Sequence, residues 1–186
     1  DYSVKKGTRA IKLNYINEPL IRNDLIKFIN YAKSKGILDI YFSTNGILLN
    51  KELSKKLIES GLTRIQISID AFTQDTYSKV RPGGNLNKII ENVNNFLSLK
   101  KELNADTPLV RVNFVKTELN EDELDTFVEL WKNKVDMIGI QEFVKPTKVT
   151  HSIKSKKTIK KKNFKCSFPF KQLVINNEKD VLPCCT

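Results

Sequence analysis

Residues 38–70 read LDIYFSTNGILLNKELSKKLIESGLTRIQISID, and this stretch decides the fold class. Two short apolar runs, 38–43 and 63–69, are predicted as strands. Between them lie a turn signal, Asn45-Gly46, and a predicted helix at about 50–60. A strand, a helix and a second strand in this order predict a βαβ unit, in which the two strands are parallel.

The same alternation of apolar runs and amphipathic segments continues on both sides of this unit. Further strands are predicted at 10–16, 109–115 and about 135–143, and further helices at 22–35, within 73–84, at about 85–103 and from Asn120 to about Trp131. This alternation predicts an α/β body of parallel strands joined by right-handed crossovers. Periodicity leaves open whether the sheet is doubly wound or a partial barrel.

Two of these helices carry more detailed predictions. The helix at 22–35 is expected to bury four apolar side chains spaced i, i+3, i+4 and i+7, namely Leu25, Phe28, Ile29 and Ala32. The last helix is expected to have Asn120 as its N-cap. Acidic residues 121–123 would then lie in its first turn, where the helix dipole favours negative charge.

The composition is that of a globular chain, with 186 residues of which 40% are hydrophobic and 28% charged. No apolar run approaches the roughly 20 residues that a membrane-spanning helix needs, so no membrane partner is expected. We expect the net charge of +11 to reflect lysines on solvated helix faces, and an anionic partner is the alternative. The lack of an initial Met and of a signal peptide indicates a fragment. The odd number of cysteines argues against a secreted disulfide scaffold and favours a cytoplasmic protein.

The segment that follows the α/β body is rich in lysine. Residues 145–163 are predicted to form an exposed basic linker, and an anion-binding arm is the alternative interpretation. Beyond it, the runs 170–175 and 181–182 flank a polar stretch at 176–180 and predict a β-hairpin.

All three cysteines of the chain, Cys166, Cys184 and Cys185, lie near this hairpin, and such clustering predicts a metal site. In an extended segment Cys184 and Cys185 point to opposite faces, so Cys166 and Cys184 are the preferred ligands. Two alternatives remain: buried thiols without a ligand role, and a zinc site that includes His151.

Polar or acidic residues follow each predicted strand of the α/β body. The carboxyl ends of parallel strands are where such folds bind ligands, so these residues together favour a small-molecule site. For any one of them, capping of the next helix is the alternative. They are Asn17, Glu18 and Pro19, then 43–46 with Asn45, then Ser68 and Asp70, then Asn113, and finally Gln141 and Glu142.

These stretches resemble motifs of the radical S-adenosylmethionine (radical SAM) superfamily. Asn17-Glu18-Pro19 is similar to its Gly-Glu-Pro motif. The similarity continues in order through Ser43-Thr44-Asn45-Gly46, Ser68-Ile69-Asp70-Ala71, Arg81-Pro82-Gly83 and the stretch 111–143. Cys166-x-x-Pro169 and Pro183-Cys184-Cys185 resemble the opening of a C-terminal SPASM or twitch extension.

The resemblance implies a partial (β/α)6 barrel in residues 1–144, with strands two to six present, the basic linker at 145–163, and the start of the extension at 164–186. It also implies an enzyme in which a [4Fe–4S] cluster reduces S-adenosylmethionine to a 5′-deoxyadenosyl radical. That radical would modify a peptide, sugar or small-molecule substrate, with flavodoxin or ferredoxin as electron donor.

The same resemblance implies which residues bind S-adenosylmethionine. Residues 17–19 would lie against the methionine amino group, and residues 140–142 near the adenine. The ribose and the carboxylate would be approached by Ser68, Asp70, Arg111 and Asn113, and Asn45 is included as a cofactor-binding residue.

Two departures from the family pattern carry consequences. No Cys-x-x-x-Cys-x-x-Cys loop occurs and no cysteine precedes Cys166, so the chain alone is expected to be inactive, because iron–sulfur clusters need cysteine thiolates. Lys179 stands where the extension usually has glycine, so the hairpin turn is expected to differ and binding of an auxiliary cluster is left open.

A second functional hypothesis is a non-catalytic basic binding module of degenerate barrel fold. Its lysine arm would bind an acidic partner or nucleic acid. No aromatic residues are interleaved with those lysines, which argues against binding of a single-stranded nucleic acid, and nucleic acid is not the expected partner.

Overall fold

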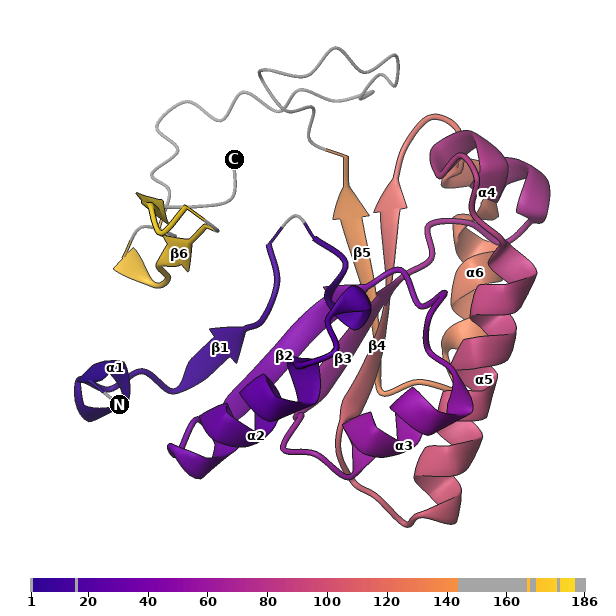
Figure 1. Ribbon diagram of the computed structural model, residues 1–186. Coiled ribbons are helices and arrows are strands. Elements are labelled where there is room, and N and C mark those ends of the chain that lie inside the picture. Colours follow the sequence, from indigo (N-terminus) through magenta and orange to yellow (C-terminus); the bar gives the residue numbers. More distant parts are fainter. Residues whose placement is uncertain (1, 16, 144–166, 168–169, 177, 183–186) are drawn as a thin grey trace.

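In the computed structural model, five parallel strands form one sheet with helices packed along it, and a two-stranded hairpin follows (Figure 1). The structure describes residues 2–15, 17–143, 167, 170–176 and 178–182. The strands are β1 (Ala10–Lys12), β2 (Asp39–Thr44), β3 (Arg64–Ser68), β4 (Leu109–Lys116), β5 (Met137–Glu142), β6 (Val174–Ile175) and β7 (Val181–Leu182). The helices are α1 (Tyr2–Lys5), α2 (Leu25–Ser34), α3 (Lys51–Ile58), α4 (Gln74–Val80), α5 (Leu86–Glu102) and α6 (Leu124–Trp131), with 3-10 turns η1 (Pro19–Ile21) and η2 (Glu121–Glu123).

The order of the strands decides between the two architectures that the sequence left open. The sheet runs β1-β2-β3-β4-β5, so each strand pairs with its neighbour in the sequence, and all four pairings are parallel. A doubly wound sheet reverses its strand order at a switch point, and this sheet does not. The fold is therefore a partial barrel of the (β/α) type.

The two faces of the sheet differ in chemistry. One face carries the apolar core of β2, β3 and β4, which packs against the helices and consists of Ile40, Phe42, Ile65, Ile67, Val110, Val112 and Phe114. Side chains alternate between faces along a strand, so the intervening residues share the opposite face. We call that opposite face the polar face, and its central residues are Ser43, Gln66, Ser68, Arg111 and Asn113.

The first strand is shorter than the predicted 10–16. Backbone pairing ends with the Leu13 N–H, which donates to the Tyr41 carbonyl over 2.8 Å. The Asn14 side chain then takes the place of backbone: its Nδ2 donates to the Ser43 carbonyl (3.0 Å) and its Oδ1 accepts from the Ser43 N–H (2.9 Å). The edge of the sheet thus continues through a side chain beyond the end of β1.

Of the detailed helix predictions, the one for Phe28 was wrong and the one for Asn120 was confirmed only in part. Phe28 on α2 is 47% exposed, with the Arg22 guanidinium 5.1 Å from its ring, whereas Leu25, Ile29 and Ala32 are buried as expected. Asn120 holds the N-cap position of η2, which contains the acidic residues 121–123 and precedes α6, but its side chain makes no capping bond. Its side chain instead binds residues at the ends of two strands, as described below.

The predicted hairpin is confirmed, since β6 and β7 pair antiparallel. The Asn176 Oδ1 closes the turn by accepting from the N–H groups of Glu178 (2.9 Å) and Asp180 (2.8 Å). Lys179 has φ +71°, a conformation that glycine adopts most easily, so the turn keeps a glycine-like backbone at this position. The basic linker, His151, Cys166, Cys184 and Cys185 lie outside the described residues.

Within the part of the chain that the structure describes, no helix is both long enough and apolar enough to cross a membrane.

Candidate functional site

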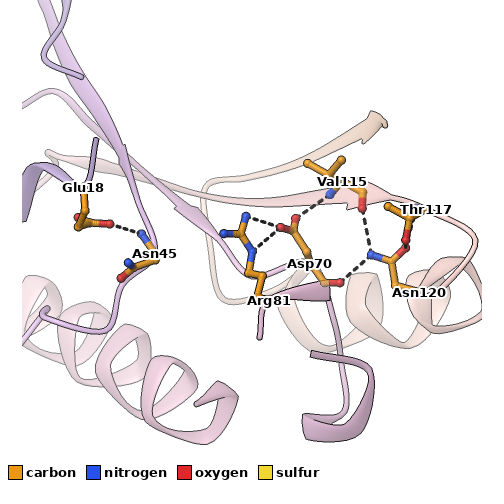
Figure 2. A network of polar contacts seen from close by, with 7 residues as sticks. All are labelled: Glu18, Asn45, Asp70, Arg81, Val115, Thr117 and Asn120. Carbon is orange, nitrogen blue, oxygen red and sulfur yellow. Dashed lines mark hydrogen bonds and ion pairs between the residues drawn. The ribbon is translucent and has the colours of Figure 1, made fainter. Parts of the chain in front are cut away.

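The carboxyl ends of the five parallel strands meet at one edge of the sheet, and the segments that leave them carry the predicted site residues. Glu18 lies in the first of these segments, just before η1. Its Oε1 accepts from the Leu20 N–H (3.1 Å) and the Thr44 hydroxyl (2.7 Å), and its Oε2 accepts from the Asn45 N–H (2.8 Å; Figure 2). Glu18 therefore fixes the segment after β1 to the end of β2.

The neighbours of Glu18 have local roles of their own. Pro19 is buried as the first residue of η1, where a proline suits a helix start. Asn17 is exposed, and its Oδ1 accepts from the Tyr15 N–H over 3.3 Å. Asn45 turns the chain after β2, because its Oδ1 accepts from the Ile47 N–H over 2.9 Å.

Asp70 ends the third strand segment in an unusual backbone conformation. Its φ is +62°, a left-handed value that aspartate tolerates better than most residues, and its surface is only 3% exposed. The carboxylate Oδ2 accepts from Nε (2.7 Å) and Nη2 (2.5 Å) of Arg81, and Oδ1 accepts from the Val115 N–H (2.7 Å; Figure 2). Both oxygens are thus bound within the chain.

Asn120 completes the connection between the ends of β3 and β4. Its Nδ2 donates to the carbonyls of Asp70 (2.7 Å) and Val115 (3.0 Å), and its Oδ1 accepts from the N–H of Thr117 (2.7 Å; Figure 2). All of these groups are largely shielded from water. The residue expected to cap a helix therefore joins two strand ends.

Glu123 binds the start of α4 from the other side of this region. Its Oε2 accepts from the N–H groups of Phe72 (2.7 Å) and Thr73 (3.1 Å), and its Oε1 accepts from the Thr73 hydroxyl. Burial alone would raise the pKa of Glu123, but the hydrogen bonds from Thr73 and Phe72 outweigh it and hold that pKa below its usual value.

Arg111 and Asn113 differ from all of these residues. Both project from β4 on the polar face, and Asn113 lies in register with Gly139 of β5. A Cβ on Gly139 would overlap Nε and Nη2 of Arg111 and Oδ1 of Asn113. The Arg111 Nε and the Asn113 Oδ1 are buried and have no hydrogen-bond partner among the residues that the structure describes. A buried donor and a buried acceptor therefore lie side by side over a glycine.

An unpaired buried polar atom costs about 1–3 kcal/mol, so such a pair calls for an explanation. The Nε–H of Arg111 can only donate, whereas the Asn113 Oδ1 can only accept. A hydroxyl group can accept from the first and donate to the second. This part of the polar face is therefore suited to a ligand that carries a hydroxyl.

The other predicted site residues lie around this pair. Ser68 is half-buried and in register with Asn113, so both belong to one row across the sheet. Gln141 lies one row further along the polar face, beside Val115, and is exposed. Glu142 is also exposed, with its Oε1 3.3 Å from the Lys116 ammonium. The structure thus brings Ser68, Arg111 and Asn113 together.

A metal site is not formed by the residues that the structure describes: no group of three histidine, cysteine or acidic side chains comes together among them. The predicted ligands Cys166, Cys184 and Cys185 lie outside those residues, so their role stays a prediction.

Sequence reasoning missed Gly139, although a signal was present. A glycine inside an apolar strand weakens the strand, and it often marks a place where another group comes close. Here the groups that come close are the side chains of Arg111 and Asn113.

Comparison with known proteins identifies relatives of this arrangement. Residues 4–138 match the family model described as the Radical SAM superfamily. The chain is 31% identical over 142 residues to a probable GTP 3′,8-cyclase of Methanocaldococcus jannaschii, covering 76% of this chain and 45% of that protein. It is 39% identical over 119 residues to the GTP 3′,8-cyclase of Alkaliphilus oremlandii, covering 63% and 35%. The chain therefore spans less than half the length of these relatives.

Solved structures show the same fold at lower identity. SuiB of Streptococcus suis matches with a TM-score of 0.63 and 19% identity, covering 80% of this chain and 32% of that one. A second structure of SuiB, bound to S-adenosylmethionine, matches with a TM-score of 0.60 and 20% identity, with the same coverage.

Proposed function

The chain belongs to the radical SAM superfamily, and we propose that it forms the S-adenosylmethionine-binding part of a radical SAM enzyme. The observation that carries this proposal is the unpaired Arg111 Nε and Asn113 Oδ1 over Gly139. Neither atom has a hydrogen-bond partner within the described part of the chain, and both lie on the polar face near the carboxyl ends of the strands.

S-adenosylmethionine fits the chemistry of this pair through its ribose. A ribose hydroxyl can accept from the Arg111 Nε–H and donate to the Asn113 Oδ1 at once. A carboxylate could accept from Arg111 but has no proton to donate to Asn113. We therefore propose that Arg111 and Asn113 bind the ribose, and that Ser68, in the same row, contributes to this subsite.

The remaining predicted residues are assigned by their position along the same edge of the sheet. We propose that residues 17–19, held in place by Glu18, lie against the methionine part of the cofactor, close to Asn45. Because the Glu18 oxygens already accept three hydrogen bonds, this segment would offer its backbone rather than the carboxylate. Gln141 and Glu142 would then lie nearer the adenine.

The residues of this chain do not fit an iron–sulfur cluster of the primary type. The sequence contains no Cys-x-x-x-Cys-x-x-Cys loop, and the chain spans less than half the length of its relatives. We propose that residues of the whole protein outside this sequence bind the [4Fe–4S] cluster. In the superfamily that cluster and S-adenosylmethionine together supply a 5′-deoxyadenosyl radical, which removes a hydrogen atom from the substrate; this chain would bind and orient the cofactor.

GTP is the first substrate to test, because relatives 31% and 39% identical to this chain are named as GTP 3′,8-cyclases. Another structure of SuiB contains a precursor peptide, but at 19% identity that likeness concerns the fold alone and carries no argument for a peptide substrate. A ferredoxin or flavodoxin as electron donor and an auxiliary cluster at Cys166 and Cys184 remain proposals. The non-catalytic binding module is not favoured, because these relatives are named as enzymes.

The test uses the full-length protein, anaerobically loaded with its cluster. Calorimetry is expected to detect binding of S-adenosylmethionine. When dithionite is added as reductant, the protein is expected to convert S-adenosylmethionine to 5′-deoxyadenosine. If GTP is the substrate, adding GTP is expected to raise the rate of this conversion. A cluster-loaded protein that neither binds S-adenosylmethionine nor forms 5′-deoxyadenosine would overturn the proposal. Product formation unaffected by GTP would exclude only GTP as substrate.

A further inference from the structure

Asp70 was predicted to bind the cofactor, yet its surroundings suit a different role. The residue is buried, and both carboxylate oxygens accept hydrogen bonds from the chain, one from Val115 and the other from Arg81. A ligand that approached this carboxylate would have to compete with a backbone N–H and a guanidinium.

The position of Asp70 explains why Val115 needs a partner. The last backbone bond between β3 and β4 runs from the Ile69 N–H to the Asn113 carbonyl over 3.1 Å. At Asp70 the chain adopts φ +62° and leaves the sheet, while β4 continues to Lys116 beside β5. Groups two residues apart on a strand point to the same neighbour, so the N–H and carbonyl of Val115 face the place that β3 has left.

Side chains fill that place and satisfy both groups. The Asp70 Oδ1 accepts from the Val115 N–H (2.7 Å), and the Asn120 Nδ2 donates to the Val115 carbonyl (3.0 Å; Figure 2). The same Nδ2 donates to the Asp70 carbonyl, which fixes the backbone of the turn. Arg81, the residue that follows α4, compensates the buried charge of Asp70.

We propose that Asp70, Arg81 and Asn120, the Asp70 network, are positioning residues for the cofactor site. This inference rests on the proposed function, since it concerns the same subsite. The network holds Val115, which is two residues beyond Asn113 on the same strand and the same face. It thereby fixes the Asn113 side chain over Gly139 without itself touching S-adenosylmethionine.

The test compares Asp70→Asn with a matched control, Asp39→Asn. Asp39 also pairs with an arginine, Arg64, and accepts from the Thr63 hydroxyl, but it lies where β2 begins, at the opposite edge of the sheet. Full-length, cluster-loaded protein is assayed for the Kd of S-adenosylmethionine, for melting temperature and for hydrogen exchange of the peptide that contains Val115.

Asp70→Asn is expected to raise the Kd by roughly fivefold to twentyfold and to speed exchange at Val115, because a charged hydrogen-bond pair is lost. Asp39→Asn is expected to lower the melting temperature while the Kd stays within about twofold. The double variant Asp70→Asn with Arg81→Gln places an amide donor opposite an amide acceptor, so it is expected to regain part of the affinity that Asp70→Asn loses.

Three results would overturn the inference. A Kd unchanged by Asp70→Asn despite faster exchange at Val115 would show that the network does not position the site. Loss of binding with unchanged exchange and no recovery in the double variant would show that Asp70 contacts the cofactor directly. Wild-type protein that binds no S-adenosylmethionine would overturn the proposed function itself, which the variants alone cannot do.

Discussion

Two groups of polar residues at the edge of this sheet differ in whether the chain satisfies them. The first group is the loop carboxylates Glu18, Asp70 and Glu123, each of which accepts three hydrogen bonds from the chain and connects segments that are distant in the sequence. The second is the pair Arg111 and Asn113, in which one donor and one acceptor are buried without a partner among the described residues.

This difference separates residues that hold the edge together from the pair that we propose faces a ligand. Acidic residues after a strand attract attention as candidate cofactor ligands, but here their oxygens hold the connecting segments in place. The unmatched atoms lie instead inside β4, where a regular strand orients both side chains toward the same face. Binding of S-adenosylmethionine is therefore expected to depend most on this pair, and folding on the loop carboxylates.

The largest effect is expected from Gly139→Ala, which tests whether the pair serves binding. The new methyl group overlaps both side chains, and Arg111, whose guanidinium ends a flexible side chain, can move away. We expect the affinity for S-adenosylmethionine to fall by roughly 2–3 kcal/mol, because both hydrogen bonds to the ribose are lost. Calorimetry on the full-length protein measures this loss, and the melting temperature, measured in parallel, shows how much the displaced side chains destabilise the folded state.

Gly61→Ala is the matched control for this variant. A Cβ there overlaps Cβ and Cγ of Lys33 on α2, so it also forces packed atoms to shift, but on the α3–β3 connection rather than at the site. Its affinity for S-adenosylmethionine is expected to equal that of the wild type. Equal losses of affinity in the two variants would contradict the assignment of Arg111 and Asn113 to the cofactor.

Much of the fold follows from sequence patterns. The five parallel strands lie where the apolar runs predict them, within one or two residues except at β1. That strand stops early because the Asn14 side chain supplies the donor and the acceptor that the backbone would otherwise supply. The spacing of apolar residues cannot reveal that a side chain has replaced the backbone in this way. The order of the strands could not be read from the sequence, because doubly wound sheets and barrels share the same alternation of elements.

The sequence could predict which polar residues gather at this edge of the sheet, but not which groups each of them contacts. The strand ends place Ser68, Asp70 and Asn113 in one region, as expected for parallel strands. The sequence does not show that the Asp70 carboxylate accepts hydrogen bonds from Arg81 and Val115, because those partners are 11 and 45 residues away. Long-range hydrogen bonds of this kind decide which of several polar residues remain available to a ligand.

A moderate effect on folding is expected from Glu18→Gln, which tests the loop carboxylates. Glutamine keeps one acceptor oxygen, but its NH2 group replaces the other. A hydrogen bond that the carboxylate accepted, from either the Asn45 N–H or the Thr44 hydroxyl, is therefore lost. We expect the free energy of unfolding to fall by about 1–2 kcal/mol, measured by urea denaturation of the full-length protein. Glu52→Gln, which breaks an exposed pair with Lys56, is the control and is expected to leave the unfolding midpoint unchanged.

The smallest effect is expected from Glu123→Gln, and it should depend on pH. Because the folded-state pKa of Glu123 lies below its ordinary value of 4.5, the ionised carboxylate stabilises the folded state above that pH, and the contribution is lost as the pH falls through the lowered pKa. Between pH 7 and pH 5, the free energy of unfolding of the variant is thus expected to be about 0.5–1 kcal/mol lower than that of the wild type. The difference is small because the Glu123 carboxylate is only partly buried. Urea denaturation of the cluster-free full-length protein between pH 7 and pH 3.5 would show the difference shrinking in acid, because a protonated Glu123 resembles glutamine. If the difference in unfolding free energy grew as the pH fell, Glu123 would stabilise the connection between η2 and α4 in its neutral form. The contrast between the loop carboxylates and the Arg111–Asn113 pair would then not extend to Glu123.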